Sequence, residues 1–345
     1  MKKFAVFSGF LGSGKTTAMM ALVKYYTAHH GKAAMISNDL GEGVTLADHR
    51  LAVLSGVNAS EITDECICFC RDVLTQRLNA CYDDGCELVI SDIPGFGVGA
   101  LEHVYHGLAG RLDFAPFTVL IEPATIAELR NGGDLAHIQD SQLREADLIV
   151  LNKCDLLSPE AAAEACTYLA ECYPEAEVLP VSARRGDGID ALFRALMEGS
   201  ASMRHPEIDY EGEALQTEMA SLSEAYYQYY ARVCCFDCDG TAYLRDLAEE
   251  ITFTPYRPVR VPHLKLLAWT PDGDYGRVDW MHGQPLEITR AFSRPCTELA
   301  VVINATAACD AKRLDSMISV AEQTVSDRFQ LEVTVHKRES FGMGD

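Results

Sequence analysis

The first 200 residues of the chain alternate short apolar runs with longer stretches of helical periodicity. The runs are almost continuously apolar, as expected for strands that are buried on both faces of a parallel sheet. They lie at 4–10, 33–39, 87–93, 117–123, 147–153 and 177–183. This pattern predicts an α/β fold with a mainly parallel sheet. Because ligands of such sheets bind beyond the carboxyl ends of the strands, we expect the chemistry to lie in the loops after these runs.

The pattern changes near residue 200. The stretch 199–212 is polar, contains a proline and is typical of a linker. The apolar runs and helical stretches that follow predict a smaller α+β domain. Within it, the sequence DGDYG at 272–276 lies between two predicted strands and favours a hairpin. We therefore predict two domains, at 1–200 and 201–345.

A glycine-rich loop follows the first predicted strand and precedes a predicted helix. Its sequence, GFLGSGKT at 9–16, satisfies the phosphate-loop pattern of nucleoside triphosphatases. In such a loop the backbone N–H groups wrap the phosphates, Lys15 reaches the β- and γ-phosphates, and the Thr16 hydroxyl ligates Mg²⁺. The nucleotide-binding residues predicted here are Gly9, Gly12, Ser13, Gly14, Lys15, Thr16 and Thr17.

Three later loops complete a nucleotide site. The sequence DIPG at 92–95 places Asp92 where it can hold the Mg²⁺ shell and Gly95 where its N–H can sense the γ-phosphate. The sequence NKCD at 152–155 follows another strand, and the Asp155 carboxylate can accept two hydrogen bonds from guanine that adenine cannot offer. These loops predict GTP as the nucleotide, Lys15 and Asp92 as catalytic residues, and further nucleotide contacts at Gly95, Asn152, Lys153, Asp155, Ser182 and Ala183.

Composition narrows the class of protein. The chain has no apolar stretch of roughly 18 residues, the length needed to span a membrane, and its N-terminus runs into the first strand with no cleavage site. Its 13 cysteines favour thiols and metal ligands in a reducing compartment, so we expect a cytoplasmic protein. The net charge of −22 argues against nucleic acid or membrane as partner and favours cations or basic protein surfaces, although it would also serve solubility alone.

These loops, together with NDLGEG at 38–43 and CICFC at 66–70, resemble the CobW-like family of P-loop GTPases, which are metallochaperones. The resemblance is strongest to members associated with corrinoid methyltransferases. Further similar stretches lie at 115–123, 142–157 and 261–273, so the likeness covers almost the whole chain and is most specific before residue 185. It implies a GTPase domain followed by the small CobW-like C-terminal α+β domain.

The resemblance also implies a metal site. Members of the family bind zinc or a similar ion through a CxCC motif, which Cys66 and Cys68 match. Phe69 stands at the third cysteine position and Cys70 follows one place later, so the resemblance predicts zinc or cobalt at Cys66, Cys68 and Cys70. A loop with incidental cysteines is the alternative. The resemblance further assigns Asp39 to orienting the attacking water, with Glu42 as the substitute and a solvated acidic turn as the alternative.

Other cysteines and histidines have ordinary structural explanations. Cys234, Cys235 and Cys238 suit buried positions in a predicted strand. His103 and His106 have helical spacing and could share a metal, but exposed helix histidines are commoner.

Together these patterns predict a protein that binds Mg²⁺ and GTP, hydrolyses GTP slowly without a partner, and acts as a metallochaperone or metal-cofactor assembly factor for zinc, cobalt or corrinoid. Its client would be a metalloprotein or a corrinoid methyltransferase component, and a homodimer is a candidate assembly because related GTPases complete their sites across a two-fold axis. The alternative is a nucleotide-switched chaperone that reactivates a corrinoid methyltransferase and carries no metal.

Overall fold

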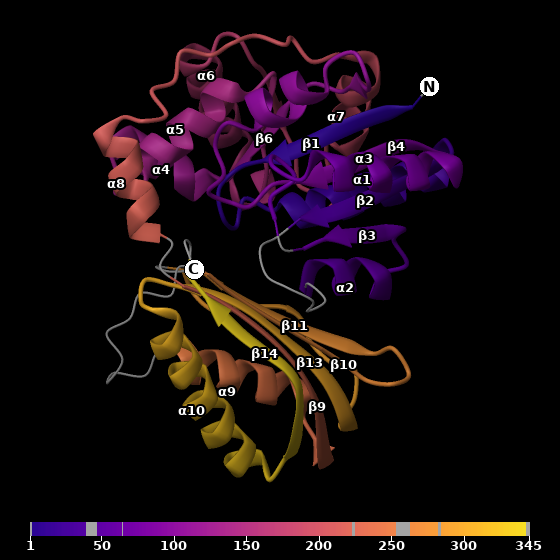
Figure 1. Cartoon of the computed structure of the whole chain (residues 1–345), viewed down its shortest axis with the longest axis vertical. Coiled ribbons are helices and arrows are strands. Elements are labelled where there is room, and N and C mark those ends of the chain that lie inside the picture. Colours follow the sequence, from indigo (N-terminus) through magenta and orange to yellow (C-terminus); the bar gives the residue numbers. More distant parts are fainter. Residues whose placement is uncertain are drawn as a thin grey trace. The chain divides into compact units, whose positions relative to one another are not determined.

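A computed structural model describes residues 2–38, 47–63, 65–222, 225–252, 263–281 and 284–342 (Figure 1). The chain divides into two compact units. The first contains Met1–Leu40 and Ser55–Met219, and the second contains Gly41–Leu54 and Ala220–Asp345.

The first unit is built on a parallel sheet. Its strands follow the order β3-β2-β4-β1-β6-β7-β8, and β5 pairs with β1. Every strand pair in the described part of this sheet is parallel, which confirms the predicted α/β class. The strands are β1 (Lys3–Ser8), β2 (Lys32–Asn38), β3 (Ala59–Ile62), β4 (Cys86–Asp92), β5 (Asp113–Phe114), β6 (Thr118–Ile121), β7 (Leu148–Leu151) and β8 (Glu177–Pro180).

Helices cover this sheet. Helices α3, α5 and α6 contribute to the same apolar core as Phe4 and Val6 of β1, whereas α1 and α7 contact each other. The helices are α1 (Lys15–His29), α3 (Arg71–Asp83), α4 (Pro123–Asn131), α5 (Ala136–Glu145), α6 (Pro159–Cys172), α7 (Ile189–Glu198) and α8 (Glu213–Leu222). Shorter helical turns are η1 (Leu101–Tyr105), η2 (His106–Leu108) and η3 (Cys154–Leu156).

The strand order determines where a ligand can bind. The central strand β1 lies between β4 and β6. Strands β2, β3 and β4 lie on one side of it in the sheet, and β6, β7 and β8 lie on the other side. A crevice forms at such a switch point, beyond the carboxyl ends of the strands. The phosphate loop follows β1, and Asp92 ends the neighbouring strand β4, opposite Phe7 of β1. The predicted nucleotide loops therefore converge on one edge of the sheet.

The second unit is built on an antiparallel sheet with the strand order β12-β11-β10-β13-β9-β14. Helices α9 (Gly240–Thr252) and α10 (Ala311–Phe329) pack together on one face of it (Figure 1). The strands are β9 (Ala225–Cys238), β10 (His263–Trp269), β11 (Tyr275–Met281), β12 (Glu287–Arg290), β13 (Cys296–Ala307) and β14 (Glu332–Phe341). The predicted hairpin is present, since β10 pairs with β11 and Thr270 N donates to Asp274 O at 2.8 Å.

Helix α2 (Ala47–Leu54) belongs to the second unit, although it lies between β2 and β3 in the sequence. It packs on the opposite face of the antiparallel sheet, because Ala47 clusters with Leu267 and Trp269, which alternate along β10 with the residues that face α9 and α10. Ala47 N also donates to Asn304 Oδ1 at 2.9 Å. The predicted boundary at 200/201 stays a prediction, but contacts group 41–54 with the later part of the chain.

A charged cluster anchors α2. Asp48 pairs with Lys265 and, at 3.2 Å, with Arg277, whose second carboxylate partner is Asp279 at 2.6 Å. The Arg277 side chain is only 12% exposed, so solvent cannot replace a lost partner.

In the described part of the chain, no helix is long and apolar enough to cross a membrane.

We predict that Asp48→Asn lowers the free energy of unfolding of the second unit by about 2 kcal/mol, because buried Arg277 loses one charged hydrogen-bond partner. Urea unfolding followed by tryptophan fluorescence measures this unit, since the two tryptophans of the chain, Trp269 and Trp280, both lie in it. Glu298→Gln is the control, because it breaks a solvent-exposed pair with Arg232 and should cost less. Equal losses in the two variants would contradict the anchoring role of Asp48.

Candidate functional site

The phosphate loop requires glycine for steric reasons. Gly9 has φ +127°, and a Cβ there would lie 2.2 Å from the Leu120 carbonyl oxygen. Gly14 has φ +90°, and a Cβ there would lie 2.3 Å from Asn152 Nδ2. Both distances are far below van der Waals contact, and both φ values favour glycine. The loop therefore packs against β6 and against the loop after β7.

The polar groups of this loop fit a triphosphate. Lys15 and Thr16 begin α1, so the loop meets the N-terminus of a helix, whose backbone N–H groups point toward an anion that binds there. Lys15 Nζ donates to the Gly9 carbonyl oxygen at 2.7 Å, which folds the ammonium group over the loop. Ser13 Oγ is buried, and no hydrogen-bond partner for it lies among the described residues. Thr17 is exposed on the first turn of α1. An anion seated here would give Ser13 Oγ a hydrogen-bond partner.

Asp92 and Gly95 border the phosphate loop. Asp92 is buried at the end of β4, and its Oδ1 accepts a hydrogen bond from Asn38 N at 3.0 Å. A Cβ on Gly95 would lie 2.9 Å from Leu11 N, so the backbones of the two loops are in contact. The carboxylate of Asp92 suits the hard oxygen coordination of Mg²⁺, and Thr16 stays the predicted second ligand.

Asn152 joins the phosphate loop to the loops predicted to bind the base. Its Nδ2 donates to Ser13 O at 2.8 Å, and its Oδ1 accepts from Ala183 N at 3.1 Å. Asp155 is held by Ser182, whose Oγ donates to Asp155 Oδ1 at 2.7 Å. Lys153 has φ +58°, and its ammonium group pairs with Glu122 at the end of β6. The structure thus brings together the residues that were predicted separately from three loops.

Asn38 links Asp92 to the cysteine segment. Its side-chain Nδ2 donates to the carbonyl oxygens of Ile62 at 3.2 Å and Glu65 at 2.9 Å. Its Oδ1 accepts from Ile67 N at 3.0 Å. Because its own backbone N–H donates to Asp92, this one buried residue ties the end of β4 to the backbone of Ile62, Glu65 and Ile67, called here the cysteine segment because Cys66 and Cys68 lie beside it.

Two of the three predicted metal-binding cysteines lie together. Cys68 donates hydrogen bonds to Cys66 from its thiol and, at 3.5 Å, from its backbone N, and these bonds lower the pKa of Cys66. The same thiol contact and burial raise the pKa of Cys68. The Cys70 thiol is directed at the carbonyl oxygens of Cys66, at 3.4 Å, and Glu65, at 3.8 Å. The geometry supports a pair of thiols, and Cys70 as a third ligand stays a prediction.

Several earlier predictions fall on other parts of the chain. Asp39 and Glu42 lie outside the described residues. His103 contacts the Phe69 ring, with centroids 5.4 Å apart. In the second unit, Cys238 is buried, as expected, whereas Cys234 and Cys235 are only half-buried, and Cys235 Sγ donates to Cys296 O at 3.1 Å.

Two residues of α5 contact the site but were not identified from the sequence. Gln142 is buried, and its Nε2 donates to the carbonyl oxygens of Gly95 at 3.2 Å and Gly97 at 3.0 Å. Glu145 accepts hydrogen bonds from Gly99 N at 2.7 Å and from Tyr210 Oη at 2.8 Å. Helix α5 therefore fixes the loop that follows Asp92. Their spacing of three residues on one helix face is a signal, but polar residues at that spacing usually face solvent.

The chain is similar in sequence to known proteins. The family described as CobW/HypB/UreG, nucleotide-binding domain, matches residues 3–180. The zinc chaperone YeiR of Escherichia coli (strain K12) is 26% identical over 219 residues, which cover 59% of this chain and 63% of that protein. The chain thus matches less than two thirds of the length of this relative.

Solved structures give weaker similarities. HypB from Helicobacter pylori in complex with nickel superimposes with a TM-score of 0.42 and 18% identity, over 56% of this chain and 85% of that one. Zn(II)-bound YjiA GTPase from E. coli superimposes with a TM-score of 0.37 and 17% identity, over 94% and 98% of the two chains.

Glu145 gives a pH-dependent prediction. Burial raises the pKa of this carboxyl to about 7, so the folded state holds the proton more tightly than the unfolded state does. Its contribution to stability is therefore present below its ordinary pKa and is lost as the pH rises through 7. We expect Glu145→Gln, which keeps both acceptor bonds, to remove up to about 3 kcal/mol of the decline in unfolding free energy between pH 5 and pH 8.

The measurement is urea unfolding at the two pH values, followed by circular dichroism. Tryptophan fluorescence serves as the internal control, because it reports the second unit, which lacks Glu145. An unchanged difference between pH 5 and pH 8 in the variant would show that Glu145 does not titrate in this range.

Proposed function

The chain belongs to the CobW/HypB/UreG family of P-loop nucleotide-binding proteins, and on that basis we propose that it binds and hydrolyses GTP in order to load and release a metal ion. The observation that carries this proposal is the bridge made by Asn38. It connects a carboxylate suited to the magnesium ion of the nucleotide with the backbone of the cysteine segment.

In the proposed nucleotide site, residues of the converging loops have separate roles. Lys15 would neutralise the β- and γ-phosphates, while Thr16 and Asp92 would hold Mg²⁺, which supplies charge stabilisation during phosphoryl transfer. Gly9, Gly12, Ser13 and Gly14 would offer backbone N–H groups, and Asp155 would read guanine. Asp39 is proposed to orient the attacking water. We expect turnover to be slow until a partner completes the site.

Coupling between the nucleotide state and metal binding is proposed from the positions of the hydrogen bonds. Loss of the γ-phosphate would change the environment of Asp92 and of the loop that Gly95 begins. Asn38 binds Asp92 through its backbone and three residues of the cysteine segment through its side chain, so a shift at Asp92 would reach Cys66 and Cys68 over one residue. Metal affinity would then differ between the GTP and GDP states.

The cargo is proposed to be zinc, with cobalt as the alternative. A pair of thiols, one with a lowered pKa, offers soft ligands that zinc accepts, and additional ligands would come from the client or from water. The similarity to a zinc chaperone supports this choice. The client is proposed to be a metalloprotein that receives the ion. A metal-free chaperone for a corrinoid methyltransferase is the competing function.

We predict that Asp155→Asn changes base preference. The amide donates a hydrogen bond where the carboxylate accepted from guanine, so binding of GTP should fall roughly tenfold or more relative to xanthosine triphosphate. Competition binding measures the ratio. Asp190→Asn is the matched control, since this exposed residue pairs with Arg194 in α7 and should leave the ratio unchanged. Tighter binding of ATP than of GTP by the native protein would overturn the guanine assignment.

We predict that replacing Cys66 and Cys68 by serine together removes one thiolate-bound metal ion and leaves GTP affinity nearly unchanged. Cobalt(II) titration of the anaerobic protein detects the site through its sulfur-to-metal charge-transfer absorption. Cys172→Ser is the control, because this cysteine is exposed on α6. The native protein should also show different metal affinities with GDP and with a non-hydrolysable GTP analogue.

Two results would contradict the metallochaperone function. One is a charge-transfer signal that survives the double substitution. The other is the same metal affinity in both nucleotide states, which would favour the metal-free chaperone.

A further inference from the structure

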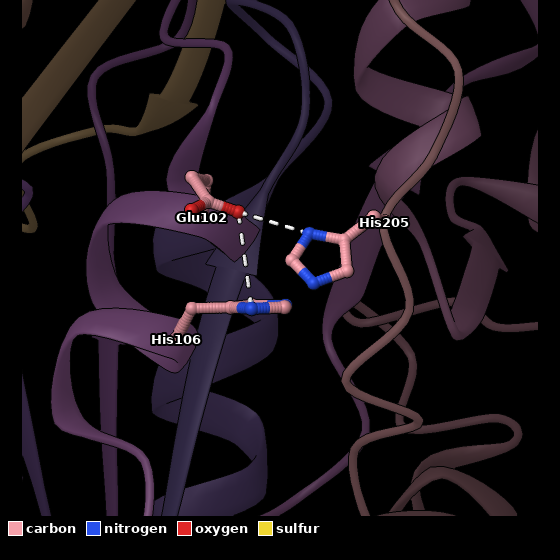
Figure 2. A group of neighbouring side chains, drawn as sticks. All are labelled: Glu102, His106 and His205. Atoms are coloured by element: carbon pink, nitrogen blue, oxygen red, sulfur yellow. Dashed lines mark ion pairs between the residues drawn. The ribbon is translucent and has the colours of Figure 1, made fainter.

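A separate group of metal-binding side chains lies in the first unit. Glu102 and His106 belong to the helical turns η1 and η2, and His205 belongs to the stretch 199–212 (Figure 2). One ligand atom from each residue lies within 4.8 Å of the other two. Among the described residues, this is the one group of three histidine, cysteine or carboxylate ligands that meets this criterion.

The distances between these atoms suit a tetrahedral ion. His205 Nδ1 lies 3.3 Å from Glu102 Oε2, and His106 Nδ1 lies 3.8 Å from the same oxygen. Zinc bound at about 2.0–2.1 Å by each ligand separates neighbouring ligand atoms by roughly 3.3–3.5 Å. The first distance already matches, and the second requires a shift of a few tenths of an ångström. Both histidines turn their Nδ1 atom toward the Glu102 carboxylate (Figure 2).

The other nitrogen of His106 faces a group found behind zinc-binding histidines. His106 Nε2 lies 3.3 Å from the backbone carbonyl oxygen of Arg204. Since a carbonyl can only accept, Nε2 must carry the proton, and in the neutral ring this leaves the lone pair on Nδ1. Metal-bound histidines usually donate their second N–H to a carbonyl or carboxylate in this way. The contact therefore orients the ring for coordination.

The segment that carries His205 is held in place by its neighbour. The Arg204 guanidinium group donates to the Ala146 carbonyl oxygen and lies 3.9 Å from Asp147 Oδ1. The rings of His106 and His205 are 4.2 Å apart, so the two imidazoles lie against each other.

The three side chains differ in their exposure to solvent. The side chains of Glu102 and His205 are 56% and 72% exposed, while that of His106 is 18% exposed. Two histidines and one glutamate supply three protein ligands, which leaves a fourth tetrahedral position open to water or to a donor from another molecule. Without an ion, such an exposed pairing would contribute little to stability.

We propose that Glu102, His106 and His205 form a zinc-binding site with one open coordination position. The site uses nitrogen and oxygen ligands only, so it stands whether or not Cys66 and Cys68 bind metal. Its open position allows exchange of the ion with solution or with another protein.

The test uses the full chain with Cys66→Ser and Cys68→Ser as the parent, so that a failure of the cysteine site does not affect the result. Equilibrium dialysis against zinc chloride should show an ion that is lost when His106→Ala and His205→Ala are added. We expect zinc affinity at this site to fall by more than the roughly 10–100-fold that loss of an outer-shell partner costs. Cobalt(II) should give visible d–d bands that disappear in the histidine variant.

His137→Ala is the matched control. His137 is an exposed histidine of the same unit that pairs with Glu218 at 2.6 Å but lies in no three-ligand group. It should leave zinc binding and the cobalt spectrum unchanged, whereas Glu102→Gln should weaken both. Equal zinc binding in the parent and in the histidine variant, or no such binding in the parent, would show an ion-pair cluster without a metal and overturn the proposal.

Discussion

The converging loops of the first unit depend on the buried carboxamide of Asn152. One side chain donates to the phosphate loop at Ser13 and accepts from Ala183, beyond β8. Gly14 approaches it so closely that a Cβ would lie 2.3 Å from Nδ2. The loop that would hold phosphates and the loops that would read the base are therefore not independent surfaces. A carboxamide suits this role because it donates and accepts at one end of a short side chain, which neither a carboxylate nor a hydroxyl of that reach does equally well.

A second buried asparagine performs the same kind of linkage on the other side of β1. Asn38 ends β2 and joins Asp92 to the backbone around Cys66. Gln142 and Glu145 extend the network, since they hold the loop from Gly95 to Gly99 through its carbonyl and N–H groups. The strands supply a rigid edge, and buried amides supply the cross-links between the loops at that edge. Such a network would transmit a change at one loop to its neighbours, because a buried polar group that loses its partner is costly.

The fold was largely predictable, but the linkages were not. Continuous apolar runs predict buried parallel strands, and β1, β2, β4, β6, β7 and β8 appear where those runs lie. Short β3, with four residues and only one fully buried, carries no such signal. Motif spacing identified Gly14, Lys15 and Asn152, because each chemistry needs a particular residue type at a particular place. It could not reveal Asn38 or Glu145, whose roles arise from partners distant in sequence, nor that α2 packs on the later antiparallel sheet.

The two candidate metal centres differ in donor chemistry, and this difference assigns them different behaviour. Cys66 and Cys68 offer sulfur, with Cys68 buried and the segment tied through Asn38 to Asp92, so their affinity would respond to nucleotide. Glu102, His106 and His205 offer nitrogen and oxygen at an exposed position with an open place for a fourth ligand. A net charge of −22 attracts cations to the protein as a whole. An exposed site exchanges ions readily, whereas a site linked to the nucleotide loops gives direction to the exchange. The combination would suit the proposed transfer of a metal ion to a client protein.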